Sequence, residues 1–180
     1  MGLQGYNLLL STPKNYEKDA HAEFWFLCLA LGDEHPLAKE TEFSGLVLGK
    51  TKYEAKDFVA RVAQFRQDTP DWKFLYLLKI EPLDRMVEQE IDVILEIFAD
   101  LVQEAQIPPD KKFKVEMKKR NSPTSQHGLI QQIAELLPNP VDLEHPDIIL
   151  KVEMLGRYCG LAILTPDQVL SLSEGIRIPI

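Results

Sequence analysis

Cysteine, histidine and glycine are scarce in this chain, and their scarcity excludes several classes of site. The 180 residues include two cysteines, four histidines and nine glycines. Cys28 and Cys159 lie far apart, each within an apolar run, which predicts buried thiols in a reducing compartment and no disulfide framework. The sequence has no Gly-x-Gly-x-x-Gly loop, His-Glu-x-x-His motif or Cys-x-x-Cys motif. We therefore expect no catalytic residues, no metal ligands and no cofactor.

Long hydrophobic runs are missing as well. No stretch approaches the roughly 18 apolar residues that cross a bilayer, and the first residues lack the basic and apolar regions of a signal peptide. We expect a cytoplasmic protein without a membrane partner. What is present, 45% hydrophobic and 27% charged residues, is typical of a folded protein and excludes intrinsic disorder.

Hydrophobic periodicity predicts an α/β (α+β) protein in two parts, with a boundary near Pro82. The first part is expected to follow the order β-α-β-α-β, with strands at 6–11, 43–51 and 72–80 and helices at 14–31 and 54–67. The second part is expected to open with a helix over 84–106, capped by Asp84, followed by a strand over 113–118 and a helix over 125–137. A hairpin of strands 148–155 and 158–164 then turns at Gly156-Arg157. The predicted domains are 1–82 and 83–180.

Charge is distributed unevenly along the chain. A net charge of −8 argues at first against nucleic-acid binding. Residues 83–110, however, carry −7, whereas residues 111–120 carry +5. Because electrostatic effects at a surface decay over about 8–10 Å, a phosphate near the basic segment responds to that segment and not to the total. The local charge therefore permits a phosphate-binding edge.

The basic segment is the main candidate site. Lys118, Lys119 and Arg120 end the predicted strand, just before two hydroxyl side chains, Ser122 and Thr124, in a pattern that phosphate sites often show. The alternative is a solvated strand edge whose lysines prevent aggregation. His127 opens the next helix and is either an RNA contact or an ordinary first-turn polar residue. The helix expected over 84–106 has an acidic face that comprises Glu88, Asp92, Glu96, Asp100 and Glu104. This face is either solvated or orients a charged partner.

The stretch from Phe113 to Leu164 resembles the THUMP domain, an RNA-binding module of tRNA-modifying proteins. The resemblance rests on four features: the basic strand 113–120, the helix containing 129–134, the series Val141-Asp142-Leu143 and Pro146-Asp147, and the strand 148–155 followed by Gly156 and Gly160. The preceding half is similar to the ferredoxin-like half of stand-alone, Tan-type THUMP proteins, the adaptors of tRNA cytidine acetylation. This chain departs from their pattern after Arg120, where it has Asn121-Ser122-Pro123-Thr124.

The resemblance implies a non-enzymatic tRNA-binding adaptor. Its partners would be tRNA, bound at the acceptor stem and 3′ end, and a separate acetyltransferase that forms N4-acetylcytidine. Asp142 and Asp147 are better explained by turn chemistry than by metal binding with Glu144 and His145. The alternative function is a protein-interaction module with a THUMP-like fold that does not bind RNA. The candidate RNA-binding residues are Lys111, Lys112, Lys114, Lys118, Lys119, Arg120, Asn121, His127, Lys151 and Arg157.

Overall fold

The computed structural model describes residues 3–122 and 125–172 and divides the chain into two compact units. The N-terminal unit comprises residues 6–82 together with the segment that starts at Asp167, and the C-terminal unit comprises residues 83–166 with the first residues of the chain. Across the described ranges, no helix combines the length and the apolar character needed to cross a membrane.

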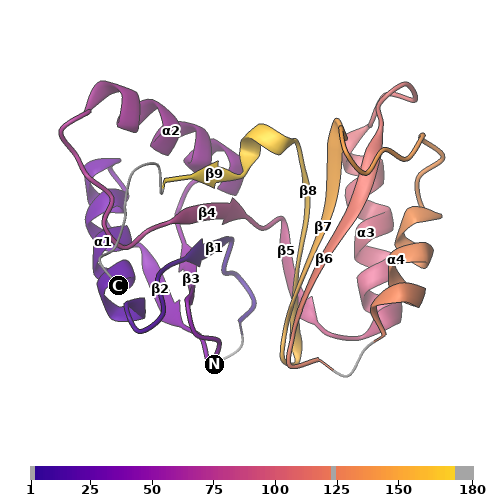
Figure 1. The fold of residues 1–180 in the computed structure, drawn as a ribbon, viewed down its shortest axis with the longest axis horizontal. Coiled ribbons are helices and arrows are strands. Elements are labelled where there is room, and N and C mark those ends of the chain that lie inside the picture. Colours follow the sequence, from indigo (N-terminus) through magenta and orange to yellow (C-terminus); the bar gives the residue numbers. More distant parts are fainter. Residues whose placement is uncertain (1–2, 123–124, 173–180) are drawn as a thin grey trace. The chain divides into compact units, whose positions relative to one another are not determined.

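The N-terminal unit is an antiparallel sheet with two helices on one face (Figure 1). The strand order is β2-β3-β1-β4-β9, so that β1 lies in the middle. Without β9, the chain order β-α-β-β-α-β and this strand order define a ferredoxin-like fold. Its elements are β1 (Leu8–Ser11), α1 (Glu17–Ala30), β2 (Leu37–Glu40), β3 (Leu46–Lys50), α2 (Ala55–Asp68), β4 (Lys79–Pro82) and β9 (Leu170–Ser171).

The two helices of this unit are held to the sheet by aromatic packing. Phe24 of α1 and Phe58 of α2 are fully buried, and their rings meet edge to face at 5.9 Å. Gly49 of β3 leaves the space that Phe24 fills, because an added Cβ would lie 2.9 Å from the Phe24 ring. The close approach of α1 to the sheet therefore depends on a glycine at this position.

The C-terminal unit is a mixed four-stranded sheet with the order β5-β8-β7-β6, covered on one face by α3 and α4 (Figure 1). The pair β6–β7 is parallel, and the other two pairs are antiparallel. Buried Ile94 and Phe98 of α3 and Leu129 and Ile133 of α4 form the core against the sheet. The elements are β5 (Arg85–Glu88), α3 (Ile91–Ala105), β6 (Phe113–Arg120), α4 (Gln126–Ala134), β7 (Ile148–Leu155), β8 (Tyr158–Leu164) and a 3₁₀ turn at Pro166–Gln168.

The structure confirms the predicted fold class, a mixed α and β protein whose second sheet is mixed. The boundary near Pro82 coincides with the change of unit, but the end of the second domain at 180 differs from the structure. The chain returns after Pro166 to the N-terminal unit, where β9 pairs with β4 through Lys79↔Ser171 and Ile80↔Leu170. A two-residue strand has no periodicity, so that the sequence pattern could not indicate it.

The predicted helix over 84–106 was wrong at its start. Residues 85–88 form β5, whose backbone pairs with β8, and the helix begins only at Ile91. Asp84 does not cap a helix; its carboxylate accepts a hydrogen bond from the Ile163 backbone N–H at 2.8 Å. Glu88 consequently lies on a strand and pairs with Arg157, and only the other four acidic residues lie on α3.

Two predicted strands of the first half were also misplaced. The strand expected over 72–80 is restricted to β4, and the strand expected over 43–51 begins at Leu46. The prediction missed β2, a short and mostly exposed edge strand with the sequence Leu-Ala-Lys-Glu. Neither apolar alternation nor β-branched residues mark this segment, and its pairing with β3 alone makes it a strand.

The packing at Gly49 gives a stability prediction. Gly49→Ala should lower the free energy of unfolding by about 1–3 kcal/mol, because the new methyl group overpacks the Phe24 ring. Gly128→Ala is the matched control, since an added Cβ there meets nothing within 4 Å and the residue is exposed on α4. It should leave stability unchanged or raise it by up to about 1 kcal/mol. Urea denaturation followed by circular dichroism measures both, and equal effects would contradict the packing argument.

Candidate nucleic-acid interface

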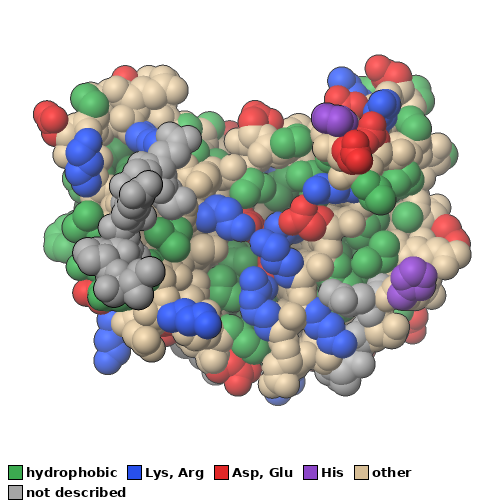
Figure 2. All heavy atoms as spheres, in the orientation of Figure 1, with side chains coloured by type: hydrophobic (Ala, Val, Ile, Leu, Met, Phe, Trp, Pro, Cys, Tyr) green, Lys and Arg blue, Asp and Glu red, His purple; other side chains and the backbone are tan. Residues whose placement is uncertain are grey.

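The basic strand β6 alternates between the core and the opposite face of its sheet, as its sequence predicts. Phe113, Val115 and Met117 pack towards α3 and α4. The opposite face of the sheet, which the helices do not cover, therefore carries Lys114, Glu116, Lys118 and Arg120, because successive side chains of a strand alternate. Basic side chains gather over β6 and β7, with acidic ones among them (Figure 2).

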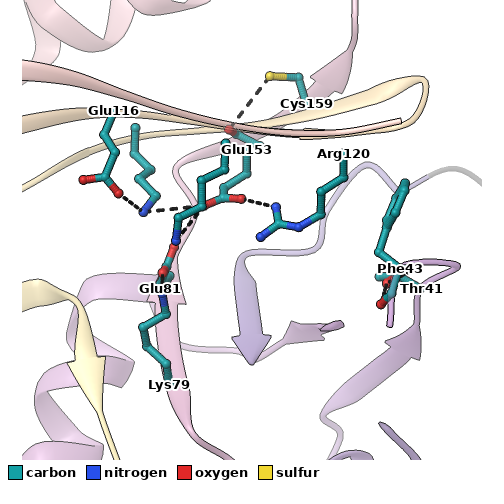
Figure 3. A network of polar contacts seen from close by, with 11 residues as sticks. Thr41, Phe43, Lys79, Glu81, Glu116, Arg120, Glu153 and Cys159 are labelled. Carbon is teal, nitrogen blue, oxygen red and sulfur yellow. Dashed lines mark hydrogen bonds and ion pairs between the residues drawn. The ribbon is translucent and has the colours of Figure 1, made fainter. Parts of the chain in front are cut away.

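The parallel register of β6 and β7 brings charges of opposite sign together. Lys118 lies opposite Glu153 and Glu116 opposite Lys151. The Glu153 carboxylate is fully buried and accepts a hydrogen bond from Arg120 Nη1 at 2.5 Å, with Lys151 Nζ at 3.5 Å and Lys118 Nζ at 4.0 Å. Figure 3 shows Glu153 with Arg120 on one side and Glu116 on the other. Three cations thus lie beside one buried carboxylate and offset the cost of keeping its charge away from water.

Glu116 connects the same cluster to Lys114. Its carboxylate accepts a hydrogen bond from Lys151 Nζ at 2.6 Å and lies 3.2 Å from Lys114 Nζ. Burial by itself would raise the pKa of Glu116, but the hydrogen bonds and charges of Lys151 and Lys114 lower it to about 2. We call these residues the strand-pair cluster; they carry a net charge of +2 and are Lys114, Glu116, Lys118, Arg120, Lys151 and Glu153.

The predicted site residues differ in how much of each remains accessible to a ligand. Lys151 is 4% exposed and serves as an internal counter-ion. Lys118 and Arg120 retain 40% and 27% of their side-chain surface. Lys119 is exposed and makes no ion pair with any residue in the ranges 3–122 and 125–172. The carboxyl end of β6 is therefore the place where accessible positive charge exceeds its local counter-charge.

The loop that follows this end is shaped by Asn121, which is exposed and has a left-handed backbone with φ of 46°. Asn tolerates this conformation better than most residues do, so that it turns the chain directly after the three basic residues. The Ser122 hydroxyl is hydrogen-bonded to Gln89 and thus takes part in the packing of the loop. Thr124, the other predicted hydroxyl donor, lies outside the described residues.

The lysines at the opposite end of β6 hold the loop before β7. Asp142 accepts hydrogen bonds from the backbone N–H groups of Glu144 and His145, and Lys112 Nζ donates to it at 2.9 Å. The His145 backbone bond, then the Lys112 bond and then the Glu144 backbone bond lower the pKa of Asp142 to about 2. Asp147 accepts from the Lys112 backbone N–H at 2.9 Å and lies 3.9 Å from Lys111 Nζ. Both aspartates therefore have the structural role that turn chemistry predicts, and Lys111 and Lys112 lie apart from the other basic end.

The two remaining candidates lie on other elements. His127 is exposed in the first turn of α4. Arg157, at the turn between β7 and β8, is 75% exposed, lies 3.2 Å from Glu88 and contacts the Tyr158 ring. No set of three potential metal-ligating side chains lies together in the part of the chain that the structure describes.

The residue that sequence reasoning missed is Glu153. Its signal was present: strand 148–155 is apolar except for Lys151 and Glu153, two residues apart and therefore on one face. Charges at alternate positions of an otherwise buried strand indicate a partner on the neighbouring strand, because an unpaired buried charge is costly. The basic residues of β6 are these partners.

The strand-pair cluster predicts a specific response to acid. Because the pKa of Glu116 falls from its ordinary value of 4.5 to about 2 on folding, its contribution to stability is present above about pH 4.5 and is lost as the pH falls towards 2. Lys151→Met should raise the Glu116 pKa more than Lys114→Met does, since Lys151 supplies the shorter hydrogen bond. Carboxyl NMR titration of the wild type and both variants measures this. An equal shift in the two variants would contradict the assignment.

The comparisons with known proteins match either part of the C-terminal unit or nearly the whole chain. The family model of the THUMP domain matches residues 88–164, from the end of β5 to the end of β8.

Three crystal structures are similar in fold. PH1313 from Pyrococcus horikoshii Ot3 is 12% identical, with a TM-score of 0.65 over 92% of this chain and 55% of its own. TrmN from Thermus thermophilus is 14% identical, with a TM-score of 0.57 over 87% and 44%. A 4-thiouridine synthetase in complex with RNA and ATP is 13% identical, with a TM-score of 0.58 over 91% and 41%.

These likenesses concern the fold, and the chain spans about half the length of the solved structures it matches. No curated protein matches its sequence. The family match, in contrast, covers the strand-pair cluster and the loop that Asp142 and Asp147 organise. Residues 88–164 of this chain therefore match the THUMP domain, and this match suggests RNA binding.

Proposed function

We propose that this protein is a tRNA-binding adaptor in the cytoplasm that presents tRNA to a separate, N4-acetylcytidine-forming acetyltransferase, without a catalytic site of its own. The observation that carries the proposal is the excess of accessible cations at the carboxyl end of β6 within a THUMP domain. The adaptor role rests on the resemblance of the chain to Tan-type THUMP proteins.

The geometry suits a phosphate backbone better than a small anion. Glu153 holds Arg120 at 2.5 Å and Lys118 at 4.0 Å, and Lys119 adds a third cation beside them. Lys118, Lys119 and Arg120 together with the Glu153 carboxylate give the strand end a net charge of +2. Lys118 and Lys119 are successive residues of β6 and therefore project from opposite faces of the sheet. Spaced, partly solvated lysines bind phosphates as point charges without reading bases. Recognition of a particular tRNA would then come from its shape.

The comparisons support RNA as the ligand. One similar structure is a 4-thiouridine synthetase bound to RNA, and it shares both units of this fold over 91% of the chain. That fold is thus compatible with an RNA complex. The acidic face of α3 belongs to the same unit as the basic strand, and its like charge would keep the phosphate backbone away from that side.

The RNA site is tested by a double variant, Lys118→Gln with Lys119→Gln. Arg120 is left in place, because a change there would leave the buried Glu153 short of its closest partner. We expect weaker binding to total tRNA and a log–log salt slope that is smaller by about two, one unit for each lost phosphate contact. Filter binding at several salt concentrations measures both quantities.

The matched control changes two exposed lysines of the N-terminal unit, Lys39→Gln and Lys50→Gln, which lie on the neighbouring strands β2 and β3. It removes the same charge and should reduce the salt slope by less than the first variant does. If both double variants behaved alike, the effect would come from net charge and not from the proposed site. Unchanged tRNA affinity in the first variant would contradict the site assignment. Absence of tRNA binding by the wild type would favour the alternative, a THUMP-like module that does not bind RNA.

The adaptor role is tested by a reconstituted acetylation reaction. It contains the tRNA cytidine acetyltransferase of the same organism, acetyl-CoA, ATP and tRNA, with and without this protein. Wild-type protein should increase N4-acetylcytidine formation, and the Lys118→Gln, Lys119→Gln variant should not, because it cannot deliver tRNA. The purified chain alone should form none. Acetylation by the chain alone would identify it as an enzyme and overturn the proposal.

A further inference from the structure

The solvent-facing side of α1 carries two adjacent aromatic residues. The buried side of this helix, with Ala20, Phe24, Leu27 and Cys28, packs into the core of the N-terminal unit. On the outer side, Trp25 and Phe26 are 41% and 57% exposed, and their rings contact each other edge to face at 5.4 Å. The same side of the helix also carries exposed Lys18 and Asp19, so that the two rings form an apolar patch with polar residues around it. An exposed apolar patch rimmed by polar residues is typical of an interaction surface.

A preformed groove lies between α1 and the segment before β4. It has a volume of about 330 Å³ and is lined by Ala22 and Phe26 of α1 and by Trp72 and Tyr76 of the facing segment, with Asp19, Glu23 and Lys73 as polar neighbours. Tyr16 stacks on Tyr76 at 5.5 Å, and Leu75 beside it is half exposed. Aromatic side chains of this density at a surface are typical of binding sites.

The groove is held open by one carboxylate. Glu23 accepts hydrogen bonds from three consecutive backbone N–H groups, those of Leu75, Tyr76 and Leu77, at 2.6–2.8 Å. These bonds attach the irregular segment to α1, and Trp72 is fixed from behind by the Phe65 ring at 5.2 Å. A groove that is rigid before binding loses little conformational entropy when it is filled.

The charges around the groove decide between classes of partner. Helix α1 and residues 69–78 contain four acidic residues and two lysines, a net charge of −2. Glu23 is engaged with the backbone, whereas Asp19 lies at the groove with its charge uncompensated by any ion pair within the described ranges. Nucleic acid and anionic lipid surfaces are repelled by such a rim, and a positively charged protein segment is attracted.

We propose that this groove, which we call the aromatic groove, docks an apolar, positively charged segment of another protein. An aliphatic or aromatic side chain of the partner enters between Phe26, Trp72 and Tyr76, and a lysine or arginine pairs with Asp19. This is the arrangement by which amphipathic segments bind preformed apolar grooves. The site lies in the N-terminal unit and does not depend on the RNA-binding role of the THUMP domain.

Two synthetic amphipathic peptides of equal length and identical apolar face, one with lysines and the other with glutamates on the polar face, test the proposal. Trp72 lines the aromatic groove, and the other tryptophan of the chain, Trp25, contacts the ring of the lining residue Phe26, so that tryptophan fluorescence provides the signal. The lysine peptide should bind and shift the emission, whereas the glutamate peptide should bind at least about tenfold more weakly. Phe26→Ser should weaken the lysine peptide about tenfold, as loss of a central aromatic contact does.

Two controls separate the proposal from its alternatives. Leu37→Ser changes an exposed apolar residue of β2 outside the groove lining and should leave binding unchanged. Asp19→Lys should weaken the lysine peptide and strengthen the glutamate peptide. Circular dichroism verifies that each variant is folded, which is expected because the changed side chains are exposed.

Equal binding of the two peptides, or unchanged binding in Phe26→Ser, would overturn the proposal. So would concentration-dependent self-association that Phe26→Ser abolishes, because it would identify a second copy as the occupant. Loss of tRNA binding in Phe26→Ser would instead identify a base-stacking surface and would also contradict it. The Lys118→Gln, Lys119→Gln variant should bind the lysine peptide normally. Failure of docking and failure of RNA binding are therefore distinguishable.

Discussion

The carboxylate of Glu153 is fully buried in β7, and a buried charge of this kind is stable only when cations lie beside it. Arg120 and Lys118 of β6 and Lys151 of β7 supply them, so that the parallel pairing of the two strands and the neutralisation of Glu153 depend on each other. The same interaction decides which basic residues remain for a ligand. Lys151 is buried and pairs with Glu116 and Glu153, whereas the charges of Lys118 and Lys119 at the strand end remain accessible.

The two units present different chemistry to their surroundings. The C-terminal unit has basic side chains along β6 and acidic ones along α3, a separation that favours a polyanion on one side only. The N-terminal unit has an aromatic groove with an acidic rim and a carboxylate, Glu23, that holds its wall in place. One surface attracts phosphate and the other repels it. The adaptor role that we propose would use this combination, because it requires an RNA and a protein to bind at the same time without competition.

Most of the elements could be predicted because their residues are periodic over several turns or alternations. The hairpin of β7 and β8 has the predicted bounds, since its apolar runs are long and Gly156 provides the positive φ that the turn requires. The prediction failed where strand pairing, and not the local sequence pattern, determines the secondary structure. Residues 85–88 fit the apolar spacing of the helix that follows, yet they are a strand because the edge of β8 pairs with their backbone. Strands β2 and β9 exist for the same reason.

The sequence by itself determined the α/β class, the basic character of β6 and the resemblance to the THUMP domain, because composition and alternation along one strand are local properties. Only the tertiary structure decided which cations are neutralised and which are accessible, since the counter-charge of Arg120 and Lys118 comes from a residue more than thirty positions away. It also decided that Phe26, Trp72 and Tyr76 line one groove, because Glu23 joins segments that are about fifty residues apart in sequence. Distances of this kind are set by sheet register and helix packing, which no local pattern contains.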